Sequence, residues 1–170
     1  MNVRIRRATP ADADFLVELA MHEEVDPFLG AGTARDRESV LAEIDRSLAE
    51  PDEFGRFVIE VDGERAGAMG FHVASRHSRI ARLEGLAVHP DFRGRGVADE
   101  AARIRLGELF ELGYHRLELE CYAFNERAIR HAERVGFVRE GVKRKAYRRH
   151  GEWVDGVLFG LVREDVEGPY

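Results

Sequence analysis

Residues 88–98 join an apolar strand to a long helix and read Val88-His89-Pro90-Asp91-Phe92-Arg93-Gly94-Arg95-Gly96-Val97-Ala98. The glycines of this segment let the backbone approach a ligand closely. The N-terminus of the helix that follows offers unpaired N–H groups and the positive end of the helix dipole. The segment therefore predicts an anion-binding turn suited to a phosphate. The alternative is a strand-to-helix turn whose glycines serve only its geometry.

Two familiar nucleotide-binding motifs do not fit this segment. A dinucleotide-binding fingerprint needs a third glycine or an alanine where Asp99 stands, and a P-loop needs Gly-Lys-Ser/Thr. The predicted phosphate site is therefore of another kind.

The rest of the chain alternates strand and helix patterns around the turn. Alternating apolar residues predict strands over 3–7, 57–61, 66–74, 80–88, 117–121, 137–147 and 154–161. Helical spacing predicts helices over about 10–24, 40–50, 97–112 and 125–135; in the second, Val40, Leu41, Ile44 and Leu48 share one face. This order predicts an α+β fold with helices on both faces of a sheet.

Composition describes an ordinary globular chain. The 170 residues predict a single domain over 1–170, with 44% hydrophobic residues and a formal charge of −6, which argues against a surface built for nucleic acid or anionic lipid. A lone cysteine, Cys121, excludes an internal disulfide, and no 18-residue apolar run is present. We expect a cytoplasmic protein without a membrane span.

Three motifs point to a known family. Arg93-x-x-Gly96-x-Ala98 follows a strand that ends in Leu86-Ala87-Val88. Downstream come Asn125-Glu126-Arg127-Ala128-Ile129 and Arg134-Val135-Gly136-Phe137. A weaker third pattern is Glu140-Gly141, a basic strand and Trp153-Val154-Asp155. Over residues 83–162 these motifs together resemble the GCN5-related N-acetyltransferase (GNAT) family, and within it the RimJ/RimL-like branch.

This resemblance implies a fold and an activity. The expected fold is a mixed, largely antiparallel sheet that splays between the strands ending at Val88 and Cys121. The expected reaction moves acetyl from acetyl-CoA directly to a primary amine, on a small molecule or a protein N-terminus, in a ternary complex. By resemblance, the amides of 95–99 hold the pyrophosphate, residues 86–88 pair with pantetheine, and Asn125 anchors the far side. The implied cofactor-binding residues are Leu86, Ala87, Val88, Arg93, Gly94, Arg95, Gly96, Val97, Ala98, Asp99 and Asn125.

Acetyl transfer to an amine needs the amine in its neutral form, so a general base is sought. Glu84 lies four residues before Val88, and the period of a strand places it on one face with Leu86 and Val88. It is the first candidate base, at a position that resembles one where several family members carry a base. The alternative is a structural acid paired with Arg82 or Arg116.

Glu120 is the second candidate carboxylate. It lies five residues before Asn125, where the protein N-terminal branch of the family carries a catalytic acid. Its neighbour Glu118 shares its face, so the alternative is a solvated or ion-paired strand face.

Two positions depart from the family pattern. The family's usual general acid is a tyrosine seven residues after the asparagine, here Asn125, and Ala132 stands at that position. Tyr122 and Tyr147 are candidate substitutes; alternatively, solvent protonates the leaving thiolate of CoA. Asp99 adds a carboxylate to the first turn of the helix, and we expect it to point outward. Cys121 fits a small core residue better than a nucleophile.

The expected partner is an amine acceptor of low pKa, an α-amine or an amino sugar. The basic run from Arg139 to Arg149 fits a solvated edge strand better than an RNA or ribosomal surface. The histidines lack metal-ligand spacing, so no metal is expected. A homodimer is left open. The competing function is a catalytically degenerate acyl-CoA-binding sensor or scaffold, which Ala132 favours slightly and the retained Glu84 and Glu120 speak against.

Overall fold

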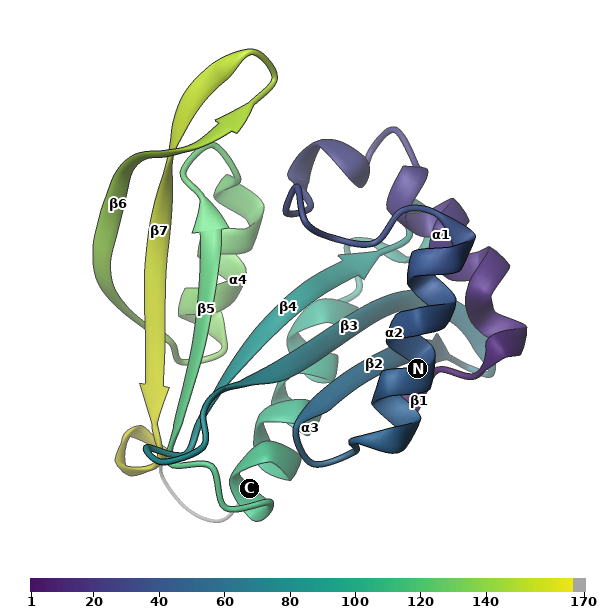
Figure 1. Cartoon of the computed structure of the whole chain (residues 1–170), viewed down its shortest axis with the longest axis horizontal. Coiled ribbons are helices and arrows are strands. Elements are labelled where there is room, and N and C mark those ends of the chain that lie inside the picture. The colour runs from purple at the N-terminus through teal and green to yellow at the C-terminus, as the bar shows by residue number, and fades with distance from the viewer. Residues whose placement is uncertain (167–170) are drawn as a thin grey trace.

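The computed structural model describes residues 1–166; residues 167–170, the end of the predicted domain, lie outside the described residues. One seven-stranded sheet forms the centre, in the order β1-β2-β3-β4-β5-β7-β6 (Figure 1). Its strands are β1 (Val3–Arg7), β2 (Phe54–Val61), β3 (Glu64–Ser75), β4 (Ile80–Val88), β5 (Arg116–Tyr122), β6 (Val138–Arg149) and β7 (Glu152–Val162). The helices are α1 (Ala13–Met21), α2 (Arg37–Ala49), α3 (Val97–Glu111) and α4 (Glu126–Arg134). The predicted order of strands and helices is confirmed.

The sheet is antiparallel except between β4 and β5, which run parallel. These two strands pair only at their first residues, through Ile80 with Arg116, Ala81 with Leu117 and Arg82 with Glu118. Beyond that point they diverge, and a fork opens between the two halves of the sheet (Figure 1). The predicted mixed sheet and its splay are thus confirmed.

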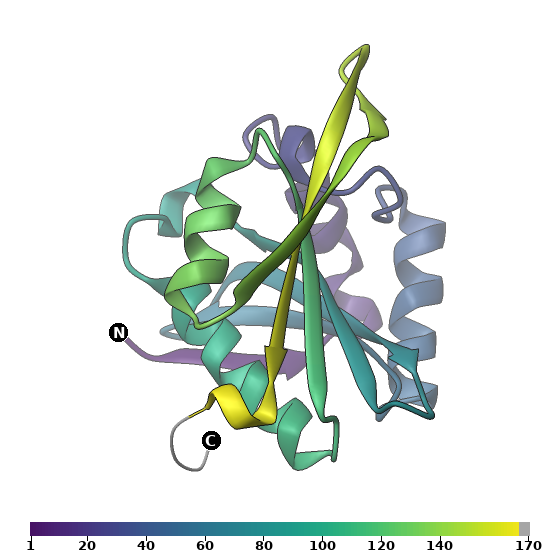
Figure 2. The same cartoon turned by 90° about the vertical axis from the view of Figure 1, so that its left-hand side faces the viewer.

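Helices cover both faces of the sheet, as predicted (Figure 2). On one face α3 and α4 pack through Leu106, Leu109 and Ala132 against strand residues such as Phe71 and Phe159. On the other face α1 and α2 pack against a second apolar cluster.

This second cluster includes Leu16, Val40 and Ile44 with Val58 and Ala68 of the sheet. Leu48 does not join them and is 49% exposed, so the prediction that it shares the buried face of α2 was wrong. Leu48 lies one residue before α2 ends at Ala49, and in this last turn the helix buries Ser47 instead.

A buried carboxylate fixes the start of α1. Asp12 closes a 3-10 turn over Pro10–Asp12, and α1 then runs only to Met21 rather than to the predicted Glu24. The carboxylate oxygens of Asp12 accept hydrogen bonds from Arg6 at 2.7 and 2.9 Å and from the Thr9 amide at 2.8 Å. The bond to Arg6 is the largest cause that lowers the pKa of Asp12 to about 2. Among residues 1–166, no helix is both long and apolar enough to span a bilayer.

Candidate functional site

The predicted anion-binding turn lies at the start of α3, where glycine is needed for its conformation. Gly94 and Gly96 have φ angles of 78° and 74°, in the left-handed region that side chains disfavour. Gly96 is the N-cap of α3, whose first turn leaves its amides without helical acceptors. A Cβ added at either glycine would meet nothing within 4 Å, so there is open space beside the turn. The turn therefore has both the amides and the room that a phosphate needs.

Asp99 does not point outward as predicted. Its oxygens lie 2.7 Å from His131 Nδ1 and 2.7 Å from Arg134 Nε, so its side chain is turned toward α4 and is 16% exposed. The bond to Arg134 is the largest cause that lowers the pKa of Asp99 to about 2, whereas burial lowers the pKa of His131. Helix α4 supplies the partners because the two helices pack side by side. The charge of Asp99 is thereby countered beside the turn.

A β-bulge at Gly85 changes the predicted face of Glu84. Glu84 pairs with Gly70 and Ala87 pairs with Ala68, so β4 takes three steps where β3 takes two. The φ of Gly85 is 65°, a conformation that favours glycine. Glu84 therefore shares a face with Ala87, toward α1 and α2. The glycine inside a strand pattern was the sequence signal for this bulge.

The predicted companions of Glu84 lie on the opposite face. Leu86 and Val88 pack against the core on the α3 side. The expectation that Glu84 shares their face was wrong, because strict alternation ends at the bulge.

Glu84 also has a different partner from those predicted. Its Oε2 lies 3.1 Å from Nδ1 of His72, and the side chain is 45% exposed. Arg82 instead approaches Glu118 and Glu120, at 3.9 and 3.8 Å.

Glu120 lies on the same face of the sheet as Glu84, across the fork. Tyr147 Oη donates a 2.6 Å hydrogen bond to its Oε2, and Lys143 Nζ lies 3.5 Å from its Oε1. The side chain is 15% exposed, and within the described chain Oε1 is a buried oxygen without a hydrogen-bond partner. Burial and the bond to Glu120 raise the pKa of Tyr147. Carboxylate and phenol thus form a fixed pair at the fork.

The other candidate side chains are engaged elsewhere. Tyr122 Oη accepts a 3.1 Å hydrogen bond from the Ala31 amide. Ala132 is fully buried in α4. Cys121 packs against the core on the α3 side, and burial raises its pKa to about 12, which makes its thiol a poor nucleophile.

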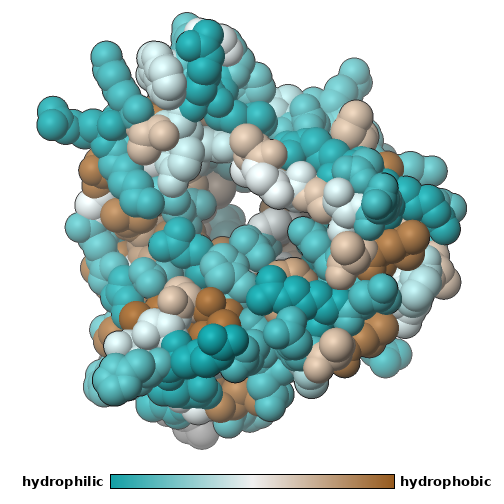
Figure 3. Space-filling view, viewed as in Figure 1, coloured by the Kyte–Doolittle hydropathy of each residue, from teal (hydrophilic) through white to brown (hydrophobic). Residues whose placement is uncertain are grey.

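A cavity of about 1000 Å³ fills the fork and brings these groups together. Figure 3, which views the α1 and α2 side, shows it as a hollow near the centre of that face. The lining includes Glu84, Glu120 and Tyr147 from the fork. Of the cofactor-binding residues implied by the sequence, ten line it: Leu86, Ala87, Val88, Arg93, Gly94, Gly96, Val97, Ala98, Asp99 and Asn125. Arg95 is absent from the lining, and its guanidinium lies over the Phe92 ring.

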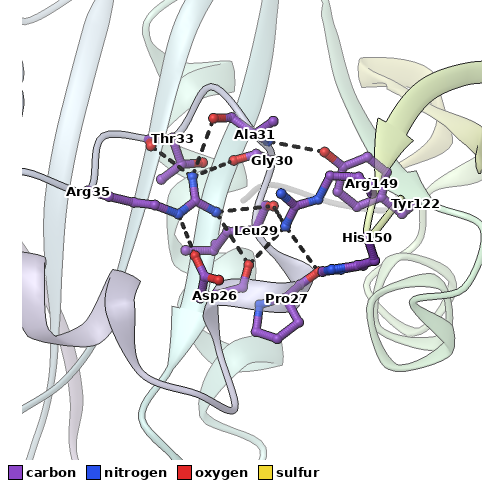
Figure 4. A network of polar contacts seen from close by, with 10 residues as sticks. All are labelled: Asp26, Pro27, Leu29, Gly30, Ala31, Thr33, Arg35, Tyr122, Arg149 and His150. Atoms are coloured by element: carbon purple, nitrogen blue, oxygen red, sulfur yellow. Dashed lines mark hydrogen bonds and ion pairs between the residues drawn. The ribbon is translucent and has the colours of Figure 1, made fainter. Parts of the chain in front are cut away.

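The segment between α1 and α2 reaches over the open end of the fork (Figure 1). We call residues 26–33 of this segment the bridge. Arg149 of the β6–β7 hairpin donates to the carbonyl oxygens of Asp26, Pro27 and Leu29 at 3.1 to 3.2 Å, and His150 lies 3.1 Å from the Pro27 carbonyl (Figure 4). The hairpin thus holds the bridge from the C-terminal half.

Arg35 holds the bridge from the other side. Its guanidinium donates to the carbonyls of Gly30 and Thr33, both at 3.0 Å, and lies 2.5 Å from the Asp26 carboxylate (Figure 4). The bridge is therefore held across the open end of the fork. We call the contacts that Arg149, His150 and Arg35 make with the bridge the clasp. The sequence did not predict the clasp, because its acceptors are mostly backbone carbonyls, which every residue carries.

Comparisons with known proteins agree with this geometry. The model of the acetyltransferase (GNAT) family matches residues 16–137. A SPbeta prophage-derived uncharacterized N-acetyltransferase, YokL of Bacillus subtilis, is 34% identical over 119 residues, which are 69% of this chain and 67% of that protein.

Two solved structures extend the likeness to the whole fold. RimJ of Mycobacterium smegmatis, in complex with CoA-disulfide, has a TM-score of 0.84 at 25% identity and covers 98% of this chain and 85% of its own. Spermidine N-acetyltransferase from Vibrio cholerae, in complex with CoA and spermine, has a TM-score of 0.84 at 18% identity and covers 96% of each chain.

Proposed function

Because the chain belongs to the acetyltransferase (GNAT) family, in its RimJ/RimL-like branch, we propose that it acetylates an α-amine with Glu84 as the general base. It is an N-acetyltransferase with acetyl-CoA as cosubstrate. The observation that carries the proposal is the single cavity that joins the α3 turn to two carboxylates at the fork.

The residues present fit the cosubstrate. Acetyl-CoA supplies an acetyl group already activated as a thioester. The amides at the start of α3 would hold its pyrophosphate, with Gly94 and Gly96 giving the turn its shape. The free edge of β4 at residues 86–88 would pair with pantetheine, and Asn125 would border the other side of the slot.

The two substrates would enter from opposite faces of the sheet. The phosphate turn begins α3, which covers one face, whereas Glu84 and Glu120 lie on the face toward α1 and α2. An amine entering from the second face would meet the thioester inside the fork. This arrangement supports direct transfer in a ternary complex, and the buried, high-pKa thiol of Cys121 speaks against a covalent intermediate.

Glu84 is better placed than Glu120 to take a proton from the amine. It adjoins the bulge at Gly85, lines the cavity, and is exposed enough to pass the proton to water. Both carboxylates have a partner, Glu84 through His72 and Glu120 through Tyr147, but Glu120 is only 15% exposed and has Lys143 beside it, so it would orient the amine rather than accept its proton.

The acceptor is proposed to be an α-amine because the site has few groups that can remove a proton. An α-amine has a pKa of roughly 7.7 to 8.0, whereas a lysine-like amine at about 10.4 costs roughly 3.4 kcal/mol more to deprotonate. A polyamine such as that in the Vibrio cholerae complex would therefore need more help from the base. Amino sugars share the low pKa, and turnover with glucosamine distinguishes them from α-amines.

Thiol release from acetyl-CoA tests the proposal. We expect turnover with α-amines of peptides or amino acid amides above that with spermidine at pH 7, and mass spectrometry should show the acetylated amine. Calorimetry should show acetyl-CoA binding in the same preparation. Binding without turnover on any amine would contradict the proposal and support the sensor or scaffold function that Ala132 favours.

A further inference from the structure

Two phenylalanines line the cavity without being buried by the fold. Phe28 of the bridge is 43% exposed and Phe124, just after β5, is 38% exposed. Their ring centroids are 6.1 Å apart, close enough for both to contact one planar group. Both lie in the lining that also contains Glu84 and Glu120. Large apolar side chains gathered in one partly exposed recess are typical of a binding site.

A continuous aromatic wall connects this pair to the fork. Phe124 stacks on Tyr122 with ring centroids 5.3 Å apart, and Tyr122 meets Tyr147 edge-on at 5.6 Å. Tyr147 in turn donates a hydrogen bond to Glu120. The carboxylate end of the cavity and its apolar end are therefore joined by one row of aromatic side chains in contact.

The clasp fixes the position of Phe28. Arg149 binds the carbonyls of Asp26, Pro27 and Leu29, which flank Phe28 on both sides, and Arg35 holds Asp26 (Figure 4). A segment whose backbone is held in this way loses little entropy when a ligand contacts it. Phe28 is thus a preformed part of the recess.

We propose that Phe28 and Phe124 form an apolar subsite for the side chain next to the acceptor amine. The acceptor is then an α-amine that carries an apolar, preferably aromatic, side chain, as in an amino acid amide or a peptide N-terminus. This inference rests on the proposed function and adds its selectivity. Amino sugars and polyamines have no group for the aromatic subsite, so they are poorer acceptors.

Amines of similar pKa test the subsite, since basicity is then constant. Phenylalaninamide and alaninamide both carry α-amines, and glucosamine shares their low pKa. Spermidine, whose amines are more basic, is measured beside them as the polyamine. We expect kcat/KM for phenylalaninamide to exceed that for alaninamide by about tenfold, because only phenylalaninamide has a ring to contact Phe28 and Phe124. Phe28→Ala and Phe124→Ala should each raise KM for phenylalaninamide about three- to tenfold and leave KM for alaninamide within twofold.

Matched variants keep the test decisive. Leu48→Ala removes an exposed apolar side chain of α2 outside the cavity and should change neither KM. Phe28→Leu retains apolar volume and should fall between wild type and Phe28→Ala. Equal losses for both amides, or a preference for glucosamine or spermidine, would overturn the subsite while leaving acetyl transfer intact. No turnover with any of the four amines would refute the proposed function, and the subsite with it.

Discussion

Replacing Arg149 with methionine should loosen the bridge while keeping an apolar stem beside Tyr122. The guanidinium Nη2 serves three carbonyl oxygens, at 3.1, 3.2 and 3.2 Å. Hydrogen bonds to charged groups contribute about 1.5–3 kcal/mol. Arg35 also donates to the carbonyls of Asp26 and Leu29, so these two oxygens keep a partner when Arg149 is replaced. We therefore use the lower value of this range. A loss of about 1.5 kcal/mol shifts the balance between the closed and open bridge by about tenfold.

Hydrogen exchange measures that balance directly. The Ala31 amide of the bridge donates to Tyr122 Oη of β5 at 3.1 Å, so it exchanges only when the bridge opens. In Arg149→Met we expect the peptide covering 26–33 to exchange about tenfold faster, with the strands unchanged. Arg148→Met is the control, because Arg148 is exposed and its guanidinium lies over the Trp153 ring. Equal exchange in the two variants would refute the clasp.

The remaining predictions concern the turn, the core and the fork. Gly96→Ala should cost about 1–2 kcal/mol of acetyl-CoA affinity by calorimetry, because its φ of 74° disfavours a Cβ; unchanged affinity would contradict the role of the turn. Asp12→Asn should destabilise the fold by about 2 kcal/mol in urea at pH 7. The pKa of Asp12 is lowered from 3.8 to about 2, so its stabilisation is present above pH 4 and lost as pH falls toward 2; a loss independent of pH would contradict the ion pair. Tyr147→Phe should lower kcat less than tenfold if it orients Glu120 rather than protonating the thiolate, and a larger fall would make it the general acid.

The fold was predictable because its signals are local. Apolar periodicity located the strands, and glycines marked the ends of helices, as at Gly113 and Gly136 with φ angles of 94° and 103°. The splay of the sheet was predicted from the family resemblance. It is confirmed by the pairing of β4 with β5, which involves only three residue pairs.

The details of the site were less predictable because they depend on register and on backbone atoms. One extra residue at Gly85 moved Glu84 to the other face of the sheet, a change that period-2 reasoning cannot detect without reading the glycine as a bulge. Asp99 turned toward partners on α4 that lie 32 and 35 residues away in sequence. The bridge is held by carbonyl groups, which every residue carries.

General-base catalysis by Glu84 is tested directly by the pH dependence of kcat/KM for wild type and Glu84→Gln with an α-amine acceptor. Glutamine keeps the size of the side chain but cannot accept the proton. We predict a loss of about 10²-fold near pH 7 that shrinks as pH rises and the amine deprotonates unaided. The matched variant Glu120→Gln should lose less. Parallel pH profiles for wild type and Glu84→Gln would contradict general-base catalysis by Glu84.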